Sequence, residues 1–186
     1  MEPRSDAPLA QPADVLAFWR EAGPDKWFTR DDAFDAEIRD KFLGTYEAAA
    51  AGQLADWEAT AEGALALVIV LDQFPRNMFR GDKRCYAADP LARAAANRAL
   101  KRGDELDVPA AERGFFFLPF MHSEDMADQD RCVALYREAG DDNLKYALRH
   151  ADIIRRFGRF PHRNAALGRA TTPEEQAYLD AGGFKG

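Results

Sequence analysis

The stretch ALALVIVLDQFPRNMFR, residues 64–80, joins a long apolar run to an abruptly polar end. Its first eight residues, 64–71, are apolar without alternation, a pattern typical of a segment buried in a protein interior. The polar residues that follow, around Phe74 and Pro75, are Asp72, Gln73, Arg76 and Asn77. Charged side chains at the end of a buried segment need partners, because burial without a partner costs several kcal/mol. We expect those partners in two later stretches, PFMHSED (119–125) and HADIIRRFGRFPHRN (150–164).

Length and composition indicate one ordinary globular domain. The chain has 186 residues, of which 47% are hydrophobic and 31% charged. A net charge of -7 argues against nucleic-acid binding, and no apolar stretch approaches the roughly 20 residues that a membrane span needs. The first residues lack the apolar core of a signal peptide. Two cysteines without CxxC spacing favour a reduced, cytoplasmic setting.

Charge is unevenly distributed along the chain. Residues 145–169 contain seven basic residues and one acidic residue, although the protein as a whole is acidic. A local basic cluster on an acidic chain indicates either an anion-binding site or a set of internal ion pairs, and a solvated helix face explains it equally well.

Hydrophobic periodicity predicts an all-α fold with no strand. Residues 1–11 are expected to form a loose tail, and residues 12–186 a single domain of stacked antiparallel helical hairpins. The predicted helices cover 12–21, 31–51, 56–74, 89–102, 109–121, 123–138, 141–157 and 173–180.

Several local signals make sharper predictions about these helices. Pro75 should stop or bend its helix, because proline lacks the backbone N–H. Asp89 and Ser123 are expected to act as N-caps. The helix at 141–157 has two adjoining apolar rows that predict a largely interior helix, with Lys145 and Arg149 pointing outward.

Three of these stretches carry a resemblance to a known family. With LDQFPRNMFRG (71–81), FFFLPFMHSED (115–125) and HADIIRRFGRFPHRNAALGR (150–169), the chain resembles an uncharacterised bacterial family catalogued as domain of unknown function 924. The resemblance covers nearly the whole chain and implies a tetratricopeptide-like arrangement of helices. That superfamily often binds peptides, so a peptide or protein partner is one implication, although a fold does not establish a function.

All three histidines, His122, His150 and His162, fall in these stretches, and the catalytic candidates are His122, His150 and Asp72. We predict one partly buried polar site that binds a small anionic molecule, with arginines holding the anion and a histidine near neutrality available for proton transfer. No cofactor and no resident metal is predicted. The expected site residues are Asp72, Gln73, Arg76, Asn77, His122, Glu124, His150, Arg159, His162, Arg163 and Asn164.

The same residues leave three other interpretations open. Histidines with Asp72 or Glu124 are ligands that a metal-assisted hydrolase would use. A tetratricopeptide-like interaction scaffold would bind a partner elsewhere and use these residues structurally. In a purely structural network, Asp72 pairs with an arginine while Gln73 and Asn77 satisfy loop backbone. The sequence leaves open whether the protein is an enzyme.

Overall fold

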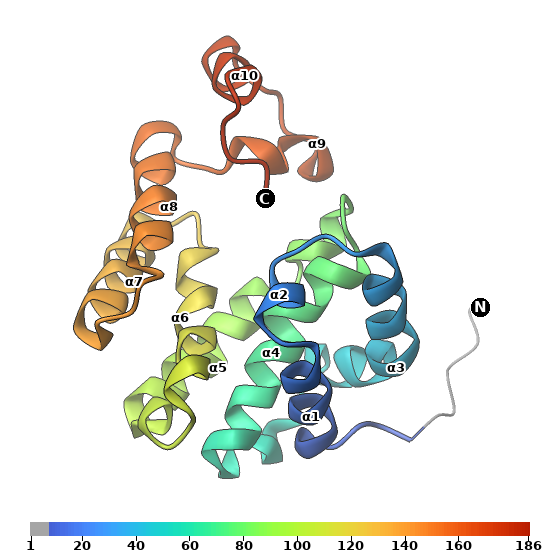
Figure 1. Cartoon of the computed structure of the whole chain (residues 1–186). Coiled ribbons are helices and arrows are strands. Elements are labelled where there is room, and N and C mark those ends of the chain that lie inside the picture. Colours follow the sequence, from blue (N-terminus) through green and yellow to red (C-terminus); the bar gives the residue numbers. More distant parts are fainter. Residues whose placement is uncertain (1–7) are drawn as a thin grey trace. The chain divides into compact units, whose positions relative to one another are not determined.

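The computed structural model describes residues 8–186, which form helices and no strand (Figure 1). The expected all-α fold is therefore confirmed, while tetratricopeptide-like stacking and the single domain stay predictions. The first seven residues of the predicted tail lie outside the described residues. The α-helices are α1 (Pro12–Ala22), α2 (Pro24–Trp27), α3 (Asp32–Ala50), α4 (Ala61–Met78), α5 (Asp89–Arg102), α6 (Gly114–Met121), α7 (Met126–Ala139), α8 (Leu144–Phe157), α9 (Asn164–Leu167) and α10 (Pro173–Asp180).

The chain divides into two compact units. Unit 1 contains residues up to 80 and 84–119, and unit 2 contains residues 81–83 and 120–186. Each unit is described by itself. None of the helices formed by residues 8–186 combines the length and the apolar character required of a membrane span.

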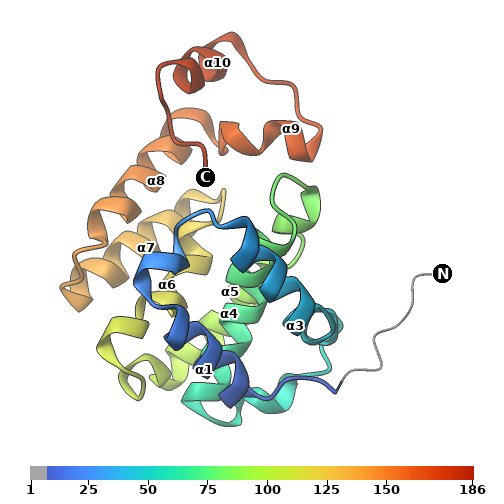
Figure 2. The same ribbon diagram turned by 45° about the vertical axis from the view of Figure 1, so that its right-hand side comes forward.

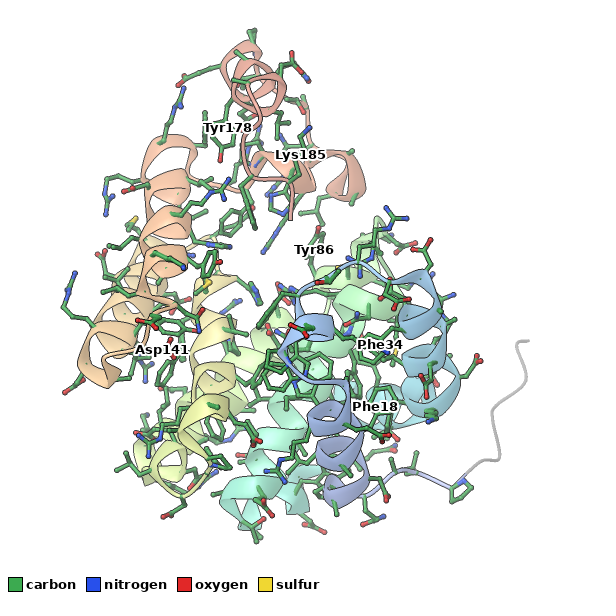
Figure 3. All side chains as sticks on the ribbon, viewed as in Figure 1. Phe18, Phe34, Tyr86, Asp141, Tyr178 and Lys185 are labelled. Atoms are coloured by element: carbon green, nitrogen blue, oxygen red, sulfur yellow. The ribbon has the colours of Figure 1, made fainter. Side chains whose placement is uncertain are left out.

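Unit 1 is built around α4, which packs against α1, α3 and α5 (Figure 2). Its apolar run is buried as expected, and Phe74 lies 4.9 Å from Phe42 and 5.8 Å from Trp19, ring centre to ring centre. Phe18 and Phe34 stack between α1 and α3 at 5.5 Å (Figure 3). The uninterrupted apolar segment thus forms the helix that the rest of unit 1 surrounds.

The sequence predicts that this helix stops or bends at Pro75. The helix does not stop there, because α4 continues to Met78. Backbone bonding resumes directly after the proline, where the Phe79 N–H donates to the Pro75 carbonyl. Phe74 and Met78 on either side are completely buried. Their packing offsets the cost of an interior proline, which is about 3 kcal/mol.

Two predicted helix caps are also wrong. The helix expected to be capped by Asp89 has Ala88 at its N-cap, and Asp89 is its first residue. The helix expected to start at Ser123 is capped by Asp125, whose carboxylate accepts the Ala127 N–H. The Asp89 carboxylate instead accepts from the distant Arg76, and the Ser123 hydroxyl donates to the nearby Asp128 at 2.6 Å.

Unit 2 contains the adjacent helices α7 and α8 and a segment with short helices that ends in α10. Gly140 and Gly158 end α7 and α8 in the left-handed conformation, as the sequence indicates. Thr172 and Glu175 form the capping box that begins α10. The predicted boundaries of these helices are therefore nearly correct.

The prediction of a largely interior α8 is wrong. Ala147, His150 and Ile154 are buried, but Tyr146 and Leu148 are exposed. One face of the helix packs, while Tyr146 and Leu148, one from each predicted apolar row, reach the surface.

Candidate functional site

The polar end of α4 forms a network of ion pairs inside unit 1. Arg76 donates to both carboxylate oxygens of Asp89, at 2.9 and 3.1 Å, and to the Asp72 carbonyl at 2.7 Å. The nearest Asp72 carboxylate oxygen is 3.5 Å from Arg76. Burial lowers the pKa of Arg76, but the two carboxylates outweigh it and the pKa is raised overall. Arg76 is therefore a permanent cation whose fork-shaped donors face carboxylates.

Gln73 and Asn77 continue this network through side chains and not through loop backbone. Gln73 donates to the Asp72 carboxylate at 2.6 Å, and Asn77 donates to Asp35 at 2.7 Å. Arg80 binds the same Asp35 through two bonds of 2.8 and 3.0 Å. The bonds from Asn77 and Arg80 to Asp35 tie the end of α4 to α3, and the Arg76 pair with Asp89 ties it to α5.

The remaining predicted site residues belong to unit 2, where Glu124, just before α7, binds the loop that follows α8. Its carboxylate accepts the Phe160 N–H at 2.8 Å and a bidentate pair from Arg169 at 2.7 and 2.9 Å. Burial raises the pKa of Glu124, but these donors outweigh burial and the pKa is lowered. Glu124 is thus held as an anion by the loop that follows α8.

Glu175 organises the rest of that loop. It accepts two bonds from Arg159, at 2.6 and 2.9 Å, one from Asn164 at 3.1 Å and one from the Thr172 N–H at 2.8 Å. The bonds from Arg159 are the main reason that its pKa is lowered to about 2. Arg159 and Asn164 therefore meet a carboxylate of the chain, and their predicted ligand-binding role stays a prediction.

The three histidines differ in their surroundings within unit 2. His150 is buried, its Nδ1 lies 2.7 Å from the Tyr146 carbonyl, and burial lowers its pKa to about 4. Nδ1 therefore carries the proton of a neutral ring. His162 packs 5.7 Å from the ring of Phe160, which lies 5.6 Å from His150. Arg163 donates to the backbone carbonyl of His122 at 2.9 Å.

Of the eleven predicted residues, Asp72, Gln73, Arg76 and Asn77 lie in unit 1 and the other seven in unit 2. Within each unit they are brought into close networks. Residues 8–186 contain no cluster of three or more His, Cys, Asp or Glu side chains that could hold a metal ion.

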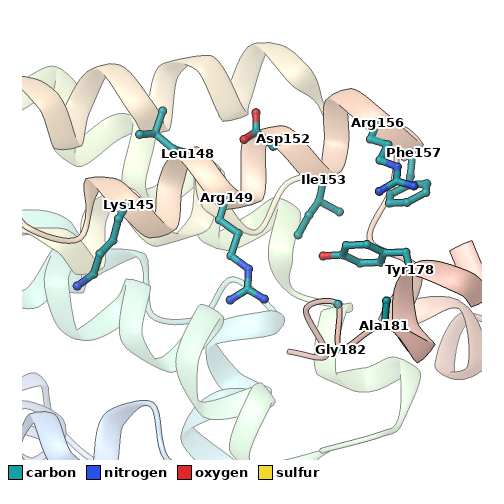
Figure 4. Close-up of a pocket in the computed structure, with 11 residues that line it drawn as sticks. Lys145, Leu148, Arg149, Asp152, Ile153, Arg156, Phe157, Tyr178, Ala181 and Gly182 are labelled. Atoms are coloured by element: carbon teal, nitrogen blue, oxygen red, sulfur yellow. The ribbon is translucent and has the colours of Figure 1, made fainter.

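A pocket of about 590 Å³ lies in unit 2 between α8 and the end of α10, and sequence reasoning missed it (Figure 4). Arg149 and Ile153 project from α8 toward Tyr178 and the turn at Gly182 (Figure 4). The basic cluster at 145–169 was the available signal. From this cluster we predicted Arg159 and Arg163 as site residues, and not Lys145 and Arg149. The sequence does not show how α10 packs, and that packing decides which cations line the cavity.

Charge in this pocket is unbalanced. Asp152 pairs with Arg155, and Arg156 pairs with Glu174 at 3.1 Å while covering the Phe157 ring. Within residues 8–186, neither Lys145 nor Arg149 pairs with a carboxylate. The two lie one turn apart on α8 and therefore share a face.

Comparisons with known proteins support one family. The family model described as "Bacterial protein of unknown function (DUF924)" matches residues 15–183. A solved structure of a protein of unknown function from Agrobacterium tumefaciens is similar, with 50% identity and a TM-score of 0.89. The match covers 91% of this chain and 97% of that one. The comparison with curated proteins gives no match.

Proposed function

The chain belongs to the DUF924 family of bacterial proteins, and we propose that it binds a small amphipathic anion in the pocket between α8 and α10. The observation that carries this proposal is the pairing, in one pocket, of two uncompensated cations with an apolar wall. The pocket's volume of about 590 Å³ lies within the range of roughly 300–1,000 Å³ that is usual for small-molecule sites.

Lys145 and Arg149 form the cationic end of the pocket. An anion bound there is attracted by two positive charges and does not have to displace a carboxylate of the protein. Arginine can bind a phosphate or carboxylate through two parallel bonds, and lysine adds a compact charge. Arg76 and Arg159 are less suited to this task, because each already holds a carboxylate through two bonds.

The apolar end of the pocket is formed by Ile153, Phe157 and Tyr178. Ile153 is buried, and the rings of Phe157 and Tyr178 lie 5.1 Å apart. A ligand with an apolar body would cover this surface and gain about 25 cal/mol for each Å² removed from water. Two cations without a carboxylate partner at one end, and at the other an apolar wall whose neighbouring cation, Arg156, is already paired with Glu174, favour an anion that carries a hydrocarbon or aromatic group.

Calorimetric titration with three compounds tests this function: phenyl phosphate, inorganic phosphate and phenol. Phenyl phosphate should bind at least about tenfold more tightly than either part alone, which corresponds to about 1.4 kcal/mol. If inorganic phosphate bound as tightly as phenyl phosphate, charge alone would explain the binding, and the apolar wall would have no role. No binding of phenyl phosphate would contradict the proposal.

Matched variants locate the binding. Lys145→Gln and Arg149→Gln should each weaken phenyl phosphate by at least about tenfold, since each removes one charge from the pocket. Arg137→Gln is the control, because Arg137 is an exposed arginine of α7 in the same unit and does not line the pocket. An equal loss in all three variants would indicate long-range charge and not this pocket.

We also propose a cytoplasmic location. Cys85 and Cys132 are buried thiols, and burial raises the pKa of Cys132 to about 12. Thiols of this kind are usual in a reducing compartment. Fractionation of cells that express the protein would test the location.

A further inference from the structure

The segment 182–186 follows α10 and folds back onto it in a specific way. Gly182 has a φ of +81°, in the left-handed region. The Gly183 N–H donates to the Tyr178 carbonyl, and the Phe184 N–H donates to the Tyr178 hydroxyl, both at 2.9 Å. A Cβ atom on Gly183 would lie 2.5 Å from that carbonyl oxygen, so only glycine fits there. The two glycines thus direct the segment against Tyr178.

Phe184 enters a slot between two histidines. Its ring centre lies 4.6 Å from that of His150 and 5.1 Å from that of His162, with both rings edge-on. The Arg149 guanidinium carbon lies 5.2 Å from the same ring centre. Edge-on aromatic contacts and a cation above a ring are each attractive. Phe184 therefore has a defined position and contacts a cation of the pocket.

The segment and the pocket share three features. Gly182 and Gly183 line the pocket, and so does Tyr178, whose hydroxyl holds the Phe184 backbone. Arg149 is both the pocket's cation and the neighbour of the Phe184 ring. Docking of Phe184 thus brings its ring against Arg149 and its backbone against Tyr178, which both line the pocket.

We propose that Phe184 is a positioning residue for ligand binding: its docking between His150 and His162 holds Arg149 and the 182–183 backbone in the geometry that binds the anion. This inference rests on the proposed function. Because coupling between two binding events is reciprocal, a bound anion stabilises the docked segment to the same extent that the docked segment strengthens anion binding.

The test measures phenyl phosphate affinity in Phe184→Ala and Gly183→Ala, two independent ways to undock the segment. Each should weaken binding at least about tenfold. Leu167→Ala is the control for lost apolar surface, because Leu167 is an exposed residue of unit 2 outside the pocket. Gly44→Ala is the control for an added methyl group, since its nearest neighbour would be 3.9 Å away. Circular dichroism verifies that each variant is folded.

Two readouts separate positioning from general damage. In a double-mutant cycle, adding Phe184→Ala to Arg149→Gln should cost little further affinity, because both remove the same interaction. The three histidine C2–H signals, assigned through single His→Gln variants, report the slot directly. Phenyl phosphate should shift those of His150 and His162 in the wild type and much less in Phe184→Ala.

Three results would decide the matter. Weakened binding in both variants with a non-additive cycle supports the positioning role. Wild-type binding that both variants keep within about twofold overturns the role of Phe184 and leaves the proposed function standing. Absence of phenyl phosphate binding in the wild type overturns the proposed function, and the positioning role with it.

Discussion

Arg76 and Asp89 form a bidentate ion pair, with bonds of 2.9 and 3.1 Å, that joins the last turn of α4 to the first residue of α5. Both side chains are mostly shielded from solvent, with 19% and 8% of the side-chain surface exposed. The pair replaces the capping role that Asp89 would have in an isolated helix. It is the clearest example here of a tertiary contact that overrides a local signal.

Removing Asp89 should destabilise unit 1 strongly. Asp89→Ala leaves the Arg76 guanidinium without its main partner, and loss of one partner of a buried pair costs about 3–5 kcal/mol. Denaturant unfolding at neutral pH measures this cost. Arg30→Ala, which breaks the exposed Arg30–Asp32 pair, is the control and should cost less than about 1 kcal/mol. A similar small cost for Asp89→Ala would show that the network does not contribute to stability.

Glu175 should make the protein sensitive to acid. Its pKa in the folded protein is about 2, below the ordinary 4.5, because Arg159 donates to it. A lowered folded-state pKa stabilises the protein above pH 4.5, and this stabilisation is lost as the pH falls from 4.5 to 2. Unfolding free energies between pH 7 and pH 2 should therefore decline more steeply in the wild type than in Glu175→Gln. Glu174→Gln, at the exposed neighbouring position, should keep the wild-type slope.

His150 should remain neutral well below the usual pH. Burial lowers its pKa from 6.5 to about 4, so the unfolded state takes up a proton before the folded state does. The free energy of unfolding is therefore unaffected by this histidine above pH 6.5, and it decreases as the pH falls from 6.5 to 4. Proton NMR of the C2–H signal should show a midpoint near 4. A midpoint at 6.5 would mean that the ring is solvated.

Two glycines in helices should respond oppositely to alanine. A Cβ on Gly63 would lie 1.9 Å from the Trp57 carbonyl oxygen, so Gly63→Ala must shift backbone and should lower the melting temperature markedly. Gly44 has room, and Gly44→Ala should stabilise α3 by roughly 0.5–1 kcal/mol. Thermal unfolding of both variants gives the comparison. A stabilising Gly63→Ala would contradict the close packing at the start of α4.

Local signals were sufficient for most of the fold. The apolar run of α4, the glycines after α5, α7 and α8, and the Thr172 capping box depend on neighbouring residues, so they could be recognised one segment at a time. The same holds for the family, because its motifs are contiguous. These features follow from backbone bonding and side-chain period, which the order of residues specifies directly.

Contacts between distant segments decided the rest. Pro75 remains inside α4 because Phe74 and Met78 are packed on both sides of it. Asp89 binds Arg76 because α5 packs alongside α4. Lys145 and Arg149 were expected to face solvent. They line a pocket because α10 and the segment after it fold over the exposed side of α8. A helical pattern shows which side of a helix a residue occupies, but only packing shows what lies opposite that side.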